Sequence, residues 1–78
     1  MFPELTVMNN TMTFEEFVMA FEQYSFLNAA KYRRGQGLYN FLHMVRPELA
    51  KAIIGGHFDP FYDDGNIDRC FEFVMREW

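Results

Sequence analysis

Apolar residues recur at helical spacing in this chain, and that periodicity constrains the fold more than any other feature. The first such segment starts at Thr13, where Thr-Phe-Glu-Glu has the pattern of a capping box and predicts the beginning of a helix. The apolar stripe of this helix, at positions i, i+3, i+4 and i+7, consists of Phe14, Phe17, Val18 and Phe21. The pattern predicts that the helix ends near Tyr24 or Ser25.

A second, longer helix is predicted from Asn28, as its N-cap, to about Val45. The core face predicted for it consists of Leu27, Ala30, Leu38, Phe41, Leu42 and Val45. Two glycines, Gly35 and Gly37, interrupt the pattern, and each costs roughly 1 kcal/mol relative to alanine inside a helix. Such a cost favours a close approach of another helix or of a ligand at this point.

Two further helices are predicted in the rest of the chain. Pro47 ends the long helix, because proline disfavours helical backbone in the residue before it, and Pro47 also suits the first turn of the next helix. That helix is predicted to end at Gly55-Gly56, after Ile54. The residues that it buries are Leu49, Ala50 and Ile53. Asn66 is the predicted N-cap of the last helix, whose apolar positions are Ile67, Cys70, Phe71, Val74 and Trp78.

Residues 57–65, between these two helices, are predicted to form an ordered aromatic and acidic loop. Its aromatic residues are expected to fold down onto the core; they are Phe58, Phe61 and Tyr62. The fold class predicted for the chain is therefore all-α, a compact bundle of about four helices with an extended N-terminal tail over residues 1–12. Residues 1–78 are expected to form a single helical domain, because domains shorter than about 50 residues are rare.

Charge is distributed along the chain as acidic, basic and acidic thirds. Residues 1–30 carry a net charge of −4, residues 31–51 carry +4, and residues 52–78 carry −4. This pattern favours a fold in which the basic middle lies between acidic neighbours, and it argues against generic binding to a nucleic-acid duplex. The chain has one cysteine, no signal-peptide pattern and no apolar run of the ~18 residues that a membrane span needs, so we expect a cytoplasmic protein without an internal disulfide.

Residues with chemical potential do not form a recognisable catalytic or metal-binding pattern. His43, His57 and Cys70 show none of the spacings of CxxC or HExxH motifs. The acidic loop fails as an EF-hand, because Pro60 would stand at its first ligand position. We therefore predict no catalytic residue, no metal and no cofactor. The remaining enzyme hypothesis is a metal-dependent hydrolase that uses His57 with an aspartate of the loop, which would be Asp59, Asp63 or Asp64.

A second face of the predicted long helix combines aromatic and polar residues. Tyrosine and arginine are the residue types that contribute most often to binding energy at protein interfaces. The predicted partner-binding residues are Lys31, Tyr32, Arg33, Arg34, Gln36, Tyr39 and His43. Two alternatives stay open: Tyr32 and Tyr39 pack beneath the acidic loop, or the basic segment 31–34 contacts the phosphates of a nucleic acid.

Three segments carry a resemblance to known proteins: RGQGLYNFL (34–42), VRPELA (45–50) and DPFYDD (59–64). They resemble segments of a widespread group of short, largely uncharacterised bacteriophage and prophage proteins. The resemblance covers about residues 31–78. It implies a viral origin and a bacterial cytoplasm, and it supplies no catalytic residue.

The function predicted on this basis is that of a small non-enzymatic phage accessory protein. It would bind a bacterial host or phage protein and change its activity, with inhibition of a host defence complex as the most specific version. The many aromatic residues and methionines support this prediction, because such side chains are enriched in interface cores. A homodimer that covers exposed aromatic residues is a further expectation. The alternative is a nucleic-acid-binding regulator that uses residues 31–34.

Overall fold

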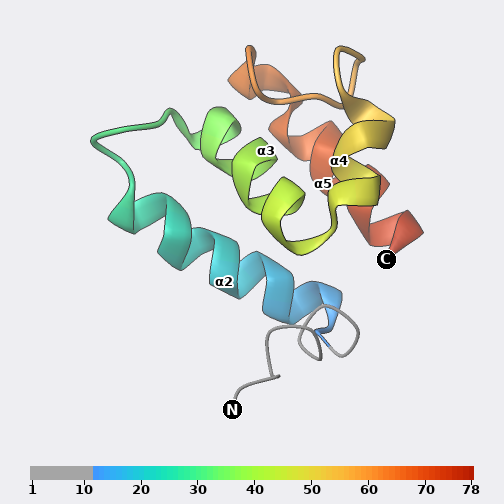
Figure 1. Cartoon of the computed structure of the whole chain (residues 1–78), viewed down its shortest axis with the longest axis horizontal. Coiled ribbons are helices and arrows are strands. Elements are labelled where there is room, and N and C mark those ends of the chain that lie inside the picture. Colours follow the sequence, from blue (N-terminus) through green and yellow to red (C-terminus); the bar gives the residue numbers. More distant parts are fainter. Residues whose placement is uncertain (1–11) are drawn as a thin grey trace.

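The computed structural model describes residues 12–78, which form four α-helices and one 3₁₀ turn with no strand (Figure 1). The elements are α2 (Phe14–Leu27), α3 (Arg34–Val45), α4 (Pro47–Ile53), η1 (Asp64–Asn66) and α5 (Ile67–Glu77). The predicted all-α class, with four helices and a loop before the last one, is confirmed. Of the predicted tail, all but Met12 lies outside the described residues.

Helix α2 begins with the predicted capping box. The Thr13 hydroxyl oxygen accepts a hydrogen bond from the Glu16 N–H at 3.0 Å, and the Thr13 N–H donates to the Glu16 carboxylate at 2.9 Å. The helix continues to Leu27, slightly beyond its predicted end, and stops at Asn28. The backbone N–H and the side-chain amide of Asn28 both donate to the Tyr24 carbonyl, at 3.0 and 2.9 Å.

The predicted start of the second helix at Asn28 was wrong. Asn28 is the C-cap of α2, and α3 begins only at Arg34, after a turn over residues 28–33. The physical reason is that Asn28 closes the preceding helix with both of its N–H groups, so it cannot open the next. Leu27 and Ala30, predicted in the core, are consequently exposed; Leu27 exposes 72% of its surface.

The helices α4 and α5 begin and end close to their predicted boundaries. Pro47 occupies the first turn of α4, and Gly55 follows that helix with a φ of 76°, a backbone conformation that favours glycine. The predicted apolar residues of α4 are buried. Asn66 stands at the N-cap position of α5, yet its side chain makes no cap; it donates instead to the Asp59 carbonyl at 3.0 Å.

Helix α3 lies between the other helices, with α2 on one side and α4 and α5 on the other (Figure 1). The core joins α2, α3, α4 and α5, and its fully buried side chains include Phe17, Phe21, Leu38, Leu42, Ile53, Cys70 and Val74. Trp78 ties the end of the fold to its beginning, because its indole N–H donates to the Met12 carbonyl at 2.7 Å. Its ring packs on Phe17 at 5.1 Å and lies under the Arg46 guanidinium at 4.2 Å.

Candidate functional site

An open groove lined by tyrosines lies between the end of α2 and the exposed side of α3. We call it the tyrosine groove; its volume is about 450 Å³, and its lining residues are Tyr24, Tyr32, Tyr39, Asn40, His43 and Met44. The three tyrosines come from three consecutive segments, namely α2, the turn over residues 28–33, and α3. The late start of α3 therefore helps to shape the groove, because Tyr32 stands in a turn rather than on a helix.

Ring contacts hold the tyrosine groove in place. The Tyr24 ring packs on Phe41 of the core with centroids 5.1 Å apart, and Tyr39 stacks on His43 at 6.2 Å. Burial, and to a smaller degree the neighbouring Tyr32, raises the pKa of the Tyr24 hydroxyl above its ordinary value of 10. At neutral pH this hydroxyl keeps its proton, so it can both donate and accept a hydrogen bond.

A second, smaller cavity adjoins the groove and shares Tyr39 with it. We call it the loop cavity; its volume is about 240 Å³, and its lining residues are Tyr39, Ile54, Gly55, Asp59, Phe61 and Tyr62. Tyr62 exposes 82% of its surface at this site. The prediction that Tyr62 folds onto the core was therefore wrong, whereas Phe58 and Phe61 are half-buried as expected. Phe58 stacks on Phe73 of α5 with ring centroids 5.3 Å apart, whereas the Tyr62 ring, further along the loop, stays exposed.

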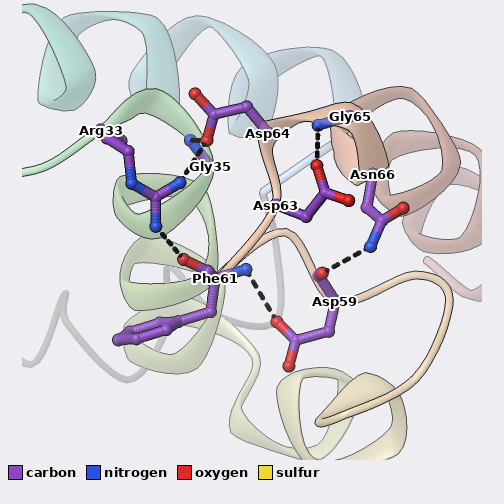
Figure 2. A network of polar contacts seen from close by, with 8 residues as sticks. All are labelled: Arg33, Gly35, Asp59, Phe61, Asp63, Asp64, Gly65 and Asn66. Atoms are coloured by element: carbon purple, nitrogen blue, oxygen red, sulfur yellow. Dashed lines mark hydrogen bonds and ion pairs between the residues drawn. The ribbon is translucent and has the colours of Figure 1, made fainter.

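Asp59 is the buried acidic residue of the loop, with 6% of its surface exposed. One carboxylate oxygen accepts the N–H of Phe61 at 2.9 Å, and the other accepts the N–H of Gly55 at 2.7 Å. Figure 2 shows the bond to Phe61 and the bond from the Asn66 side chain to the Asp59 carbonyl. These contacts fix the loop from the end of α4 to the start of α5.

Arg33 and Asp64 join the same loop to the beginning of α3 (Figure 2). The Arg33 guanidinium pairs with the Asp64 carboxylate at 2.8 Å and donates to the Phe61 carbonyl at 2.5 Å. The same Asp64 oxygen accepts the Gly35 N–H at 3.0 Å, in the first turn of α3. We call this set of four residues the Arg33–Asp64 clasp.

The clasp explains one of the two glycines. A side chain at Gly35 would collide with the Pro60 carbonyl oxygen and the Asp64 carboxylate, so the close approach predicted there is made by a loop. A Cβ atom added at Gly37 would lie 3.8 Å from the Tyr24 ring and 4.0 Å from the Tyr32 side chain, which are ordinary contact distances. Only Gly35 is therefore required by its surroundings.

Arg34 pairs within the chain as well. Its two terminal nitrogens donate to the two carboxylate oxygens of Glu22, each at 2.7 Å, and its guanidinium lies 5.1 Å from the Phe21 ring. The hydrogen bond from Arg34 lowers the pKa of Glu22, and the same bond raises the pKa of Arg34. Two of the five basic residues of the middle segment, Arg33 and Arg34, thus pair with carboxylates of the acidic segments on either side of it.

The seven predicted partner-binding residues do not all lie at one site. Three of them line the tyrosine groove: Tyr32, Tyr39 and His43. Arg33 and Arg34 hold carboxylates of the chain itself, Lys31 is exposed in the turn, and Gln36 is half-buried and lines neither cavity.

Several lining residues were not predicted. Asn40 and Met44 each follow a predicted residue by one position, so widening the predicted face of α3 would have included them. Tyr24 had been assigned only to the end of its helix. Packing of Tyr32 and Tyr39 against the acidic loop was one of the alternatives left open by the sequence. The structure has this contact for Tyr39, whose ring meets Phe61 with centroids 5.6 Å apart, whereas Tyr32 lines only the tyrosine groove.

Residues 12–78 offer little support for a metal site or for a cysteine nucleophile. Across residues 12–78, no group of three or more His, Cys, Asp or Glu side chains is arranged to hold a metal ion. Burial, and to a smaller degree the charge of Asp59, raises the pKa of the Cys70 thiol to about 12, so this thiol is not a nucleophile at neutral pH. His57 is exposed in the turn that follows α4.

Comparison of the chain with protein-family models, with curated proteins and with solved structures gives no match. Among the helices of residues 12–78, none has the length and apolar character that crossing a bilayer requires.

Proposed function

We propose that this chain is a small non-enzymatic binding protein that recognises a protein partner through the tyrosine groove. The observation that carries the proposal is the convergence of Tyr24, Tyr32 and Tyr39 from three segments around one open groove. Tyrosine offers a large apolar ring together with a hydroxyl, and it loses little conformational freedom on binding. Met44, which exposes 60% of its surface beside these rings, adds a flexible apolar contact.

The partner in this proposal is a bacterial host protein, and the chain is a phage accessory protein that inhibits it in the bacterial cytoplasm. The resemblance of segments 34–42, 45–50 and 59–64 to phage proteins supports this origin. A defence complex of the host is the most specific form of the proposal.

The pairing of the two arginines argues against the nucleic-acid alternative. Arg33 and Arg34 direct their guanidinium groups to Asp64 and Glu22, so a phosphate would have to displace a carboxylate from each. Among the described residues, no Lys or Arg side chain lines the groove itself.

Capture from a bacterial lysate with matched variants tests the proposal. The tagged wild-type chain is compared with a groove variant, Tyr32→Ala with His43→Ala, and with a control variant, Met19→Ala with Phe26→Ala. Met19 and Phe26 are exposed residues of α2 that line neither cavity, with exposed fractions of 72% and 80%. We expect the groove variant to capture about tenfold less partner protein than the wild type, or less still, and the control to capture as much as the wild type.

Thermal unfolding followed by circular dichroism shows whether each variant keeps its fold. Capture that persists at high salt and is insensitive to nuclease supports a protein partner, because phosphate contacts weaken steeply as salt is added. Equal capture by the groove variant and the wild type would exclude the tyrosine groove as the binding site. Capture that disappears with nuclease would favour the nucleic-acid alternative instead.

A further inference from the structure

Three aromatic rings line the loop cavity, and the middle one, Phe61, stands at a steep angle to each of the other two. The Phe61 ring meets Tyr39 at 5.6 Å with an interplanar angle of 89°, and it meets Tyr62 at 4.7 Å with an angle of 65°. Rings at such angles form walls of a cavity rather than one flat platform. The faces of aromatic rings carry partial negative charge, and a cation within about 6 Å of a ring centre is attracted to it.

A buried carboxylate completes these walls. Asp59 lines the cavity, and each of its oxygens accepts one backbone N–H, from Gly55 and from Phe61. An ionised carboxylate can accept about four hydrogen bonds, so both oxygens keep acceptor capacity. None of the ion pairs formed among residues 12–78 includes Asp59. A buried charge that lacks a counter-ion is costly, and a bound cation would offset that cost.

From this combination we infer that the loop cavity holds the alkylammonium group of a lysine side chain on the protein partner. The inference rests on the proposed function for the identity of the partner as a protein. The volume of about 240 Å³ admits a side-chain terminus, and the exposed Tyr62 and Ile54 leave the cavity accessible from solvent. Ile54 and the rings contact the alkyl chain, while Asp59 and the ring faces contact the ammonium group.

The hydrogen bonds of Asp59 favour an ammonium over a guanidinium. A guanidinium pairs best with both oxygens of a carboxylate at once, in a planar arrangement. Here each oxygen already accepts a backbone N–H, from Gly55 at 2.7 Å and from Phe61 at 2.9 Å. A guanidinium would therefore have to use the remaining acceptor positions of both oxygens at once and in one plane. A compact ammonium needs only one of these positions.

Nuclear magnetic resonance titration with two small probes tests the inference without any partner present. The probes are N-acetyl-lysine amide and N-acetyl-norleucine amide, which has a similar alkyl chain without the amine. We expect the lysine probe to shift the signals of Phe61 and Tyr62 and to bind about fivefold more tightly than the norleucine probe. Equal binding of the two probes, or no binding of the lysine probe, would overturn the inference.

Two Tyr→Leu variants locate the binding. Tyr62→Leu should weaken the lysine probe about fivefold, because one wall of the cavity is lost, and the exposure of Tyr62 makes this variant safe for the fold. Tyr32→Leu is the matched control in the tyrosine groove and should leave probe binding unchanged. Unchanged binding in Tyr62→Leu would also overturn the inference. Failure of the probes leaves the groove-dependent capture experiment intact, so the two proposals fail separately.

Discussion

Helices α2 and α3 begin in different ways, and the difference explains which parts of this molecule its sequence reveals. At the start of α2, the Glu16 N–H donates to the Thr13 hydroxyl oxygen and the Thr13 N–H donates to the Glu16 carboxylate, so both partners lie within three residues of each other. In α3 the N-cap residue, Arg33, makes no side-chain cap, and the Gly35 N–H is bound by Asp64, which lies 29 residues away. The start of α2 is therefore a local property, whereas the start of α3 depends on the folded loop.

This dependence links the loop to the candidate binding surface. The loop that contributes Asp64 to the clasp also contributes Asp59, Phe61 and Tyr62 to the loop cavity. Tyr39 of α3 lines both cavities. We therefore expect changes at the start of α3 to reach the binding surface and changes at the start of α2 to leave it intact.

The largest effect is expected from a side chain at Gly35. Gly35→Ala should lower the free energy of unfolding by roughly 1–3 kcal/mol, because the added methyl group collides with the Pro60 carbonyl and with Asp64. Gly37→Ala should leave stability unchanged or raise it by up to about 1 kcal/mol, since space is available there and alanine favours helix. Urea unfolding of both variants measures the difference. Equal free energies of unfolding for the two variants would mean that the loop does not pack closely against the start of α3.

A smaller loss of stability is expected when the side chain that accepts an N–H at the start of α3 or of α2 is removed. Asp64→Ala should cost about 1–2 kcal/mol, because it removes both the bond to the Gly35 N–H and the ion pair with Arg33, which is half-exposed. Thr13→Ala should cost about 1 kcal/mol.

The two cap variants should differ more in where they act than in how much they destabilise. Hydrogen exchange is expected to quicken at Gly35 in Asp64→Ala, with changed signals for Tyr39 and Phe61. In Thr13→Ala it is expected to quicken only at the start of α2. Undisturbed Tyr39 signals in Asp64→Ala would separate the clasp from the binding surface.

The smallest effect concerns the ion pair between Arg34 and Glu22, which joins α3 to α2. Because Arg34 lowers the pKa of Glu22 below its ordinary value of 4.5, the pair stabilises the fold above that pH and loses its contribution as the pH falls through the lowered value. Both side chains are about half exposed, so the contribution should be below about 1 kcal/mol. Urea unfolding of Glu22→Gln should show a deficit at neutral pH that shrinks under acid conditions. A deficit that is independent of pH would contradict this assignment.

The sequence predicts the fold well where the signals are local. The capping box at Thr13, the break at Pro47 and the glycine at 55 each act within a few residues, and each marks a helix boundary in the structure. The prediction at Asn28 was wrong because asparagine is favoured at both ends of a helix. In the structure its side chain donates to the Tyr24 carbonyl of the preceding helix, which makes Asn28 the end of α2.

The candidate site follows the same division. Tyr39 and His43 are one turn apart on α3, so their common face was visible in the spacing. Packing of Tyr39 beneath the acidic loop was only one of the open alternatives, because its contact with Phe61 is tertiary and no local spacing decides it. Arg33 was predicted to contact a partner because arginine contributes often to binding energy at interfaces. The structure adds a role that no local pattern indicated, since the loop supplies a carboxylate and a carbonyl to the Arg33 guanidinium.

The hydrogen bond from Trp78 to Met12 determines what fluorescence can report about folding. It joins residues 66 positions apart, and Trp78 is the only tryptophan of the chain. Closing so long a loop is unfavourable until the intervening helices have packed, so we expect indole emission to report a late event, the packing of α2 against Trp78. None of the clasp residues contacts the Trp78 ring, which meets Phe14, Phe17 and Arg46. We therefore expect opening of the Arg33–Asp64 clasp alone to leave indole emission unchanged, so that spectroscopy of the tyrosines is needed to observe it.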